Sequence, residues 1–300
     1  MKLVTMSKFG RYGRFANQIF EYGFLQGYTR EYGCELQLPT WIGNHLFGTS
    51  DSPVTATLPP WQEPGSGLHH PTPPRGDELV GKDFLGYAQY HTSYFAPRKE
   101  EFISYFQPAP KLLARCTPAL AQLRAQGSTI VALHFRRGDY GQSIFPITPT
   151  SWYLRWLEKN WKRFENPVMF IATEDTSLVS EFAEYNPQTL ETLGVTLEMP
   201  PPQKDTLKYD TETKNLRAMD FYVDFWLLSQ AQILLGPAST FSFAAAMLAP
   251  NLREFWRATL TAAEFVPTDP WNDYPSLREH VKNFPHLEGI ALDSNPYWGR

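Results

Sequence analysis

The chain has 300 residues, of which 42% are hydrophobic, so it is long and apolar enough to fold around a substantial core and is not a disordered protein. Its 27 basic and 31 acidic residues give a net charge of −4, which argues against nucleic acid or an anionic membrane surface as the main partner. Two cysteines, Cys34 and Cys116, are too few for a disulfide framework or a zinc site. No apolar run has the length of a signal peptide or a membrane span, so we expect a cytoplasmic protein with at most peripheral membrane contact.

The first hundred residues predict one strand, one glycine-rich loop and one long helix, followed by irregular chain. A short strand is expected over 2–6, a loop over 10–14 and a helix over about 17–32. Strand, glycine-rich loop and helix in this order can present backbone N–H groups to a phosphate. The loop is neither a Walker A nor a G-x-G-x-x-G sequence, so an ordinary βα turn is an equal alternative. Prolines and glycines over 39–78 predict a loop-rich segment.

The remainder of the chain predicts regular alternation of strands and helices, and hence an α/β protein with a parallel sheet. Helices are expected within 98–126, and Gly127 marks a boundary between domains 1–127 and 128–300. Strands are predicted over 129–135, 167–173, 195–199 and 233–236. Helices are predicted after a cap at Thr150 or Ser151, over 177–184, over 216–230 and over 239–248.

The strand over 129–135 ends in charged residues, and this junction is the strongest functional signal in the sequence. The strand is almost continuously apolar, as expected of one buried on both faces, and Arg136 and Arg137 follow it directly. Ligands of open α/β sheets bind beyond the carboxyl ends of the strands. Two guanidinium groups there suit an anion, phosphate above all. The alternative is a strand that simply ends in solvated charge.

A second signal is the helix that opens with Ser239, Thr240, Phe241 and Ser242 after the strand over 233–236. Serine and threonine are favoured N-caps, so Ser239 alone indicates no more than a cap. Three hydroxyl groups at one helix N-terminus, with its partial positive charge and unpaired N–H donors, also suit a phosphate. This helix start and the two arginines could therefore converge on one anion.

A third signal is Asp224, an acid within an apolar helical segment. Burying a carboxylate is costly unless donors satisfy it. The Watson–Crick edge of guanine offers two N–H donors that a carboxylate matches. The alternative is an acid on the helix surface near a basic side chain.

At these residues the sequence resembles a known family. The pattern His134-x-Arg136-Arg137-x-Asp139 is similar to the H-x-R-R-x-D signature of the α-1,2-fucosyltransferases of glycosyltransferase family 11, which α-1,6- and protein-O-fucosyltransferases share. Residues 15–22 resemble the G-N-Q-[ML]-F-Q-Y segment of that family, with Ala16 in place of the glycine. Residues 224–229 and 239–242 resemble its D-F-x-L-[ML] and S-T-F-S motifs, and 167–175 fit the intervening strand end more loosely.

The resemblance implies an α/β, GT-B-like architecture of two Rossmann-like domains facing a cleft, and an inverting transferase that moves L-fucose from GDP-fucose to a glycan hydroxyl. Arg136 would stabilise the β-phosphate of the leaving GDP, which makes it a catalytic residue. Asp139 is the nearest carboxylate and would act as a base or orient the arginines. The implied donor-binding residues are Asn17, His134, Arg136, Arg137, Asp224, Ser239, Thr240 and Ser242.

The resemblance implies no metal and no further cofactor, and the sequence has no D-x-D motif of the kind that holds a divalent cation against a diphosphate.

Three functions stay open. The first is α-1,2 transfer to a galactose-type acceptor; the second is a fucosyltransferase of another linkage or a transferase of another GDP-sugar. The third is a non-catalytic carbohydrate-binding or adhesion protein, which the tripeptide Arg137-Gly138-Asp139 and the many aromatic residues would suit.

Overall fold

The structure is a computed structural model that describes residues 2–65, 70–137, 140, 146–195, 220–277, 279, 283–284 and 286. The chain divides into two compact units. Among these residues, 2–114 and Trp271–Tyr274 belong to the first unit, and the others belong to the second. The division falls between Ala114 and Arg115, inside helix α4 (Pro110–Gln126), whereas the predicted boundary lies at the end of that helix, at residue 127.

The first unit has a four-stranded parallel sheet in the order β2-β1-β4-β3. Its elements are β1 (Leu3–Thr5), α1 (Phe15–Tyr32), β2 (Glu35–Gln37), α2 (Ile42–Leu46), β3 (Pro60–Gln62), β4 (Asp83–Leu85), the 3₁₀ helices η1 (Thr92–Tyr94) and η2 (Ala96–Arg98), and α3 (Lys99–Ser104). The chain leaves β1 for β2 on one side and returns to β3 and β4 on the other. Strand order therefore reverses between β1 and β4, the place where open α/β sheets bind ligands.

The predicted strand over 2–6 and helix over 17–32 are confirmed as β1 and α1, whereas the sheet around them was not predicted. All four of its strands have only three residues, too few to show a periodic pattern. The segment over 39–78, expected to be irregular, contains α2 and β3. Helix α1 is buried along most of its length and ends at Gly33, which has a left-handed φ of 61°.

The second unit has a five-stranded sheet in the order β6-β5-β7-β8-β9, parallel except for the edge strand β9. Its elements are the C-terminal part of α4, β5 (Thr129–Phe135), α5 (Thr150–Asn160), η3 (Trp161–Arg163), β6 (Pro167–Thr173), η4 (Thr176–Tyr185), α6 (Asp220–Ser229), β7 (Ile233–Gly236), α7 (Thr240–Met247), β8 (Glu254–Thr259) and β9 (Glu264–Pro267). Strand order reverses between β5 and β7, which gives this sheet its own ligand-binding position.

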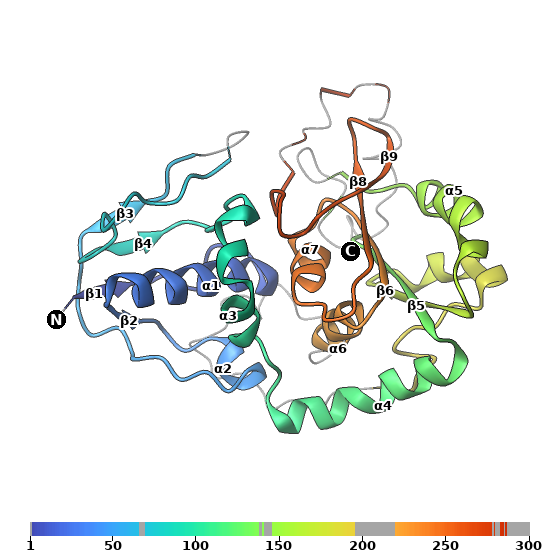
Figure 1. Cartoon of the computed structure of the whole chain (residues 1–300), viewed down its shortest axis with the longest axis horizontal. Helices are drawn as coiled ribbons and strands as arrows, with labels where there is room; N and C mark the ends of the chain where they lie inside the picture. Colours follow the sequence, from blue (N-terminus) through green and yellow to red (C-terminus); the bar gives the residue numbers. More distant parts are fainter. Residues whose placement is uncertain are drawn as a thin grey trace. The chain divides into compact units, whose positions relative to one another are not determined.

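Helices cover both faces of the second sheet, with α5 on one face and α6 and α7 on the other (Figure 1). The face toward α5 has a large apolar core, in which Phe135 stacks at 4.0 Å between ring centroids with the tilted ring of Tyr153. All seven residues of β5 are buried, which explains why its sequence shows no alternation.

Most predicted elements of this unit are confirmed, with some differences in type and extent. The helix over 177–184 is a 3₁₀ helix, η4, and strands β8 and β9 were not predicted. Helix α5 begins at Thr150 after Pro149, and no side chain caps it, so Thr150 and Ser151 are not its cap. Residues 196–199 of the predicted strand over 195–199, and residues 216–219 of the helix over 216–230, lie outside the described residues.

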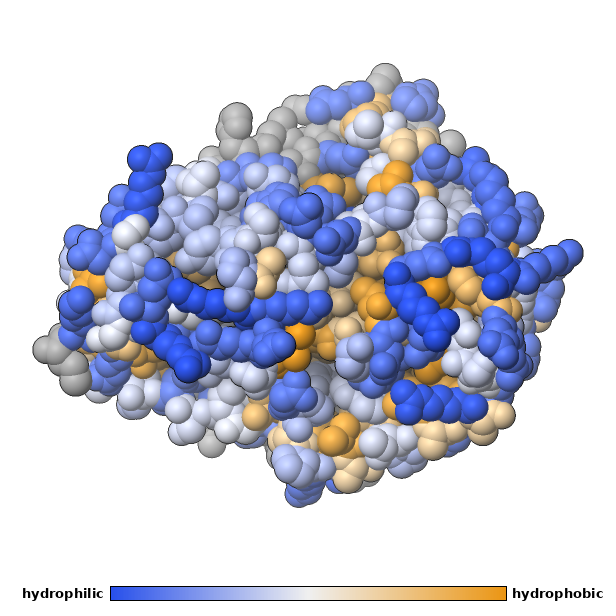
Figure 2. Space-filling view, in the orientation of Figure 1, coloured by the Kyte–Doolittle hydropathy of each residue, from blue (hydrophilic) through white to orange (hydrophobic). Residues whose placement is uncertain are grey.

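Hydrophilic side chains predominate on the face drawn in Figure 2, with smaller hydrophobic areas between them. None of the helices in the described part of the chain combines the length and hydropathy needed to span a bilayer.

Candidate functional site

The carboxyl ends of three neighbouring strands meet at one edge of the second sheet. Strand β5 lies between β6 and β7, and the register pairs Phe135 with Thr173 and Leu133 with Leu235. The residues that follow these strands therefore come together although they are far apart in the sequence. Arg136 follows β5, Glu174 follows β6, and the turn that opens α7 follows β7.

Arg136 lies at the centre of this edge, with only 18% of its side chain exposed. Its guanidinium forms an ion pair with Glu174, and the same carboxylate accepts the backbone N–H of Arg137 at 3.1 Å. The guanidinium also lies 5.6 Å from the ring centroid of Tyr140. The Tyr140 hydroxyl donates to the carbonyl of Ala238 at 3.2 Å, so these contacts link Arg136 to the turn before α7.

His134 lies inside β5, two residues before Arg136, and its ring faces α7. Its ring is 5.0 Å from that of Phe241, and its carbonyl accepts a 2.6 Å hydrogen bond from the Tyr153 hydroxyl. The imidazole is 4% exposed, and its Nδ1 has no hydrogen-bond partner among the described residues. Burial, with the charges of Arg136 and Arg137, lowers the pKa of His134 to about 3. The side chain is therefore neutral at physiological pH, and a buried neutral imidazole can donate or accept one hydrogen bond.

Arg137 is oriented differently from Arg136, since its side chain packs toward α5. Its guanidinium lies 5.3 Å from the ring centroid of Phe135 and 3.4 Å from the hydroxyl of Thr150, at the start of α5. The side chain is buried, and desolvation lowers the pKa of Arg137. The structure thus brings Arg136 to the turn before α7 and uses Arg137 to join β5 to α5.

The start of α7 is built as its sequence predicts, with Ser239 as the N-cap. The Ser239 hydroxyl accepts from the N–H of Phe241 at 3.3 Å. Thr240 is half-buried at the first helical position. Ser242 is fully buried, and its hydroxyl donates to the Ser239 carbonyl at 3.4 Å and packs where a Cβ of Gly236 would stand. Of the three hydroxyl groups, that of Thr240 is therefore the most exposed.

Asp224 is half-buried on α6, which packs against α7. The next residue, Phe225, contacts the ring of Phe241 at 5.2 Å, and Phe241 contacts His134. Asp224 therefore precedes Phe225 in the sequence, and ring contacts connect Phe225 through Phe241 to His134 near the end of β5. The predicted catalytic residue Asp139 lies outside the described residues.

Asn17 belongs to the first unit, near the start of α1. Its side-chain carbonyl accepts from the amide of Gln89 at 2.8 Å, across 72 residues of sequence. Its amide nitrogen lies against Gly13, which has a φ of 86°, and a Cβ on Gly13 would come within 1.7 Å of that nitrogen. The turn at Gly13 therefore requires glycine both for its backbone conformation and for the position of Asn17.

The sequence alone did not reveal three contributors to these sites. Glu174 follows the strand over 167–173, and nothing local indicates its pairing with Arg136. Tyr140 and Gln89 carry no motif. The parallel register of β5 and β6 could have indicated Glu174, because carboxyl ends of neighbouring strands share one edge.

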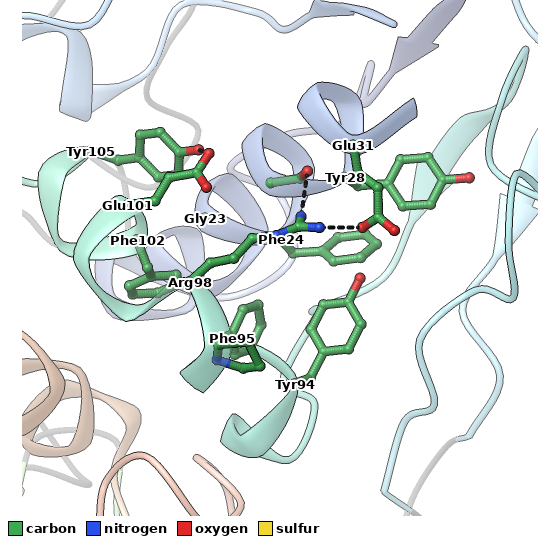
Figure 3. Close-up of a pocket in the computed structure, with 12 residues that line it drawn as sticks. Gly23, Phe24, Tyr28, Glu31, Tyr94, Phe95, Arg98, Glu101, Phe102 and Tyr105 are labelled. Atoms are coloured by element: carbon green, nitrogen blue, oxygen red, sulfur yellow. Dashed lines mark hydrogen bonds and ion pairs between the residues drawn. The ribbon is translucent and has the colours of Figure 1, made fainter. Parts of the chain in front are cut away.

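A cavity elsewhere in the first unit is lined by the C-terminal half of α1 and by the segment from Tyr94 to Tyr105 (Figure 3). Its charged groups pair within the protein: Arg98 donates to the Gly27 carbonyl at 3.1 Å and to Glu31 at 2.8 Å. None of the predicted site residues lines it. Within the ranges that the structure describes, no three His, Cys, Asp or Glu side chains cluster in a way that could hold a metal ion.

Comparison with known proteins links this arrangement to one group of structures. No protein-family model matches the sequence, and no curated protein matches it significantly. The fucosyltransferase NodZ from Bradyrhizobium matches with a TM-score of 0.55 at 11% identity, over 90% of this chain and 99% of that chain. A variant of FUT1 from Arabidopsis thaliana in complex with GDP matches with a TM-score of 0.55 at 12% identity, over 90% of this chain and 74% of that chain. POFUT1 in complex with GDP matches with a TM-score of 0.52 at 13% identity, over 85% of this chain and 97% of that chain.

These matches cover both units and confirm the predicted fold class. The chain has an α/β, GT-B-like fold with two parallel-sheet units, similar to that of fucosyltransferases. A structure of NodZ, described as an α-1,6-fucosyltransferase, was obtained after soaking with GDP-fucose, and it matches with a TM-score of 0.54 at 11% identity over 89% of this chain and 99% of that chain.

Proposed function

We propose that this protein is an inverting glycosyltransferase that transfers L-fucose from GDP-fucose to a glycan hydroxyl. The single observation that carries the proposal is the position of Arg136, which Tyr140 links to the turn before α7 at the reversal of strand order in the second sheet. A guanidinium and a helix N-terminus are both suited to a diphosphate. The similarity of the fold to structures that contain GDP or GDP-fucose supports the same substrate.

In the proposed reaction an acceptor oxygen attacks the anomeric carbon of fucose while the bond from that carbon to the β-phosphate oxygen breaks. The electron pair of the broken bond stays on GDP, and the acceptor proton passes to a base or to solvent. Arg136 would stabilise the charge that develops on the β-phosphate, with the start of α7 adding N–H donors. These groups supply the positive charge that a metal ion provides in other transferases, so we propose a metal-independent enzyme.

Glu174 competes with the donor diphosphate for the guanidinium of Arg136 in this proposal. Its carboxylate pairs with Arg136, so a bound diphosphate must share the guanidinium with Glu174 or displace it. The buried, neutral His134 and the half-buried Asp224 are proposed to contact the guanosine part of the donor. For the acceptor we propose a galactose-type sugar and an α-1,2 linkage, following the motif resemblance, with another linkage or another GDP-sugar as the alternative.

Incubation of the purified protein with GDP-fucose and a panel of glycan acceptors tests this function. We expect release of GDP and a fucosylated product, whose linkage is determined by NMR. Competition between GDP, UDP and ADP for binding should favour GDP. Absence of both transfer and GDP-fucose hydrolysis, or a preference for UDP, would contradict the proposal.

A further inference from the structure

The cavity of Figure 3 lies apart from the reversal of strand order in the first sheet. Helix α1 begins beyond the carboxyl end of β1 and ends just before the amino end of β2, and its C-terminal half lines the cavity. The ligand position expected of this sheet lies at the opposite end of the helix. The cavity is therefore separate from the loop over 10–14 and from Asn17.

The space exists because two glycines, Gly23 and Gly27, lie one turn apart on the same face of α1. Packing requires Gly23, since a Cβ there would lie 2.2 Å from the ring of Phe102. Gly27 is helical, and among the described residues a Cβ there would meet only the Arg98 guanidinium, at an ordinary 3.9 Å. Glycine inside a helix is less favourable than alanine. Gly27 therefore lowers helix stability and keeps the cavity open.

Aromatic rings form the floor of the cavity, and polar groups form its rim. Phe95 and Phe102 are buried, whereas Tyr94 is 40% exposed, and the side chains of Arg98 and Glu31 are 45% and 40% exposed. The hydroxyl of Tyr94 points toward the carboxylate of Glu31 (Figure 3). The volume is about 150 Å³, and an apolar cavity of that size can hold one six-membered ring.

The rim keeps hydrogen-bonding capacity that the protein does not use. The two hydrogen bonds of Arg98, to Gly27 and Glu31, fix a guanidinium that has five N–H donors. The hydroxyl of Tyr94 has no hydrogen-bond partner among the described residues. A ligand in the cavity would therefore meet a fixed guanidinium, a fixed carboxylate and a hydroxyl group.

These features select a neutral ring with several hydroxyls. Each of the two carboxylates that line the cavity pairs with an arginine, Glu31 with Arg98 and Glu101 with Arg30, so neither an anion nor a cation finds an unbalanced opposite charge. An aromatic molecule such as phenol would stack on the floor but brings one hydroxyl to three polar groups. A pyranose places its C–H groups against an aromatic ring and carries several hydroxyls that donate and accept.

We infer that the cavity of Figure 3 binds one neutral pyranose ring of a glycan, with the ring on the aromatic floor and its hydroxyls on Glu31, Arg98 and Tyr94. The inference does not rest on the proposed function. It assigns a second place at which the protein holds a glycan, without chemistry there. Binding can therefore be measured in the absence of GDP-fucose.

Saturation-transfer difference NMR with the methyl glycosides of galactose, glucose and N-acetylglucosamine, recorded without nucleotide, tests the site. We expect at least one glycoside to bind the native protein with a Kd on the order of 1 mM, as is usual for so small a ligand. Gly27→Leu should abolish the signal, because its side chain fills the cavity. Glu100→Leu adds the same side chain at an exposed position of α3 outside the cavity and should leave the signal unchanged.

Smaller changes test the rim and the role of the glycine. Tyr94→Phe removes only the hydroxyl and should raise the Kd about fivefold, and Glu31→Gln should raise it similarly. Glu100→Gln is the control for the second change. Gly27→Ala should raise the Tm, because alanine favours the helix. A lower Tm would show that the fold itself requires glycine there and would remove the argument for an open cavity.

The outcomes separate this inference from the proposed function. The site is overturned if no glycoside binds, or if Gly27→Leu folds by circular dichroism and binds as well as the native protein. Should Gly27→Leu fail to fold, an unchanged Kd in both Tyr94→Phe and Glu31→Gln overturns it instead. Binding of phenol in preference to every glycoside also contradicts it. GDP binding should be the same in all variants, and its absence from the native protein would contradict only the proposed function.

Discussion

The two parallel sheets each reverse their strand order once, between β1 and β4 in the first unit and between β5 and β7 in the second, and different chemistry lies beyond each reversal. The second unit links the guanidinium of Arg136, through Tyr140, to the turn before α7, and Glu174 is its ion-pair partner. The first unit fixes the amides of Asn17 and Gln89 and displays the ring of Tyr87.

The difference shows that one sheet topology can carry two kinds of polar chemistry. A guanidinium that is mostly shielded from water attracts an anion strongly, because the low local dielectric strengthens its field. Aromatic rings and amides offer little net charge. Basic side chains also occur near the first reversal, at Lys8, Arg11 and Arg14. All three are exposed, so water and salt screen their charge.

The largest effect is expected from Arg136→Ala. Without the guanidinium the leaving diphosphate loses its main positive contact in the second unit, and transfer should fall by on the order of a hundredfold or more. Arg136→Lys should recover only part of the rate, because an ammonium cannot bind an anion through two parallel N–H groups. Steady-state kinetics measures both rates.

Arg163→Ala is a suitable control for this change, since Arg163 forms an ion pair with Glu254 at the surface of the same unit. An exposed pair contributes little to stability. Equal losses of activity in the two variants would mean that Arg136 has no special role in transfer.

The second effect concerns pH and His134. Its pKa is about 3 in the folded protein, below the usual 6.5, so the unfolded chain binds the proton first as the pH falls. The contribution of His134 to stability is therefore complete above pH 6.5 and is lost between 6.5 and 3, by about 1.4 kcal/mol per pH unit. Urea unfolding between pH 7 and 4 should show a shallower loss of stability for His134→Gln. The same change at the exposed His45 is the control. If the free energy of unfolding falls with pH by the same slope in the native protein and in His134→Gln, the buried imidazole does not cause the loss.

The third effect has the opposite sign and lies in the first unit, at Glu21. This residue of α1 is fully buried, and neither carboxylate oxygen has a hydrogen-bond partner within the described residues. Burial, with the charge of Glu63, raises the pKa of Glu21 well above 4.5. Its contribution to stability is therefore present below pH 4.5 and is lost as the pH rises toward the folded pKa, by about 1.4 kcal/mol per pH unit.

Glu21→Gln should therefore stabilise the protein above pH 4.5, by an amount that grows with pH. Urea unfolding at pH 5 and pH 8 measures the difference, and Glu100→Gln at an exposed position of α3 is the control. A destabilising effect of Glu21→Gln at pH 8 would show that the Glu21 carboxyl is charged and paired in the folded protein.

The smallest effect is expected at Ala88, in the loop after β4, which has a left-handed φ of 50°. Ala88→Gly should stabilise the protein by about 1 kcal/mol, because glycine adopts the left-handed conformation without a steric penalty. Ala263, with a φ of 53° in the second unit, is the matched comparison, and Ala263→Gly should give similar stabilisation in urea unfolding. No stabilisation by Ala88→Gly would show that the left-handed conformation of Ala88 carries no cost.

The contrast between the two units also explains what the sequence could predict. The strands over 129–135 and 167–173 were predicted with the bounds that the structure shows, because a nearly continuous run of apolar residues leaves few alternatives. The three-residue strands β2, β3 and β4 carry no such pattern. They form by pairing, β2 and β4 with β1 and β3 with β4, which is information from distant parts of the chain.

The same limit applies to the sites. The strand-end rule led to Arg136 and the capping preference led to Ser239, since both are local signals. The pairing of Arg136 with Glu174 and of Asn17 with Gln89 depends on tertiary contacts. Arg136 and Arg137 follow β5 directly and point to different sides of it, a feature that a motif read as letters does not show.

The most direct test of the account is a crystal structure of the protein with GDP. We expect the β-phosphate within hydrogen-bond distance of both the Arg136 guanidinium and the backbone N–H groups at the start of α7, with the ion pair between Arg136 and Glu174 opened or shared. A diphosphate bound away from α7, or one bound at α7 while Arg136 stays paired with Glu174 alone, would contradict it.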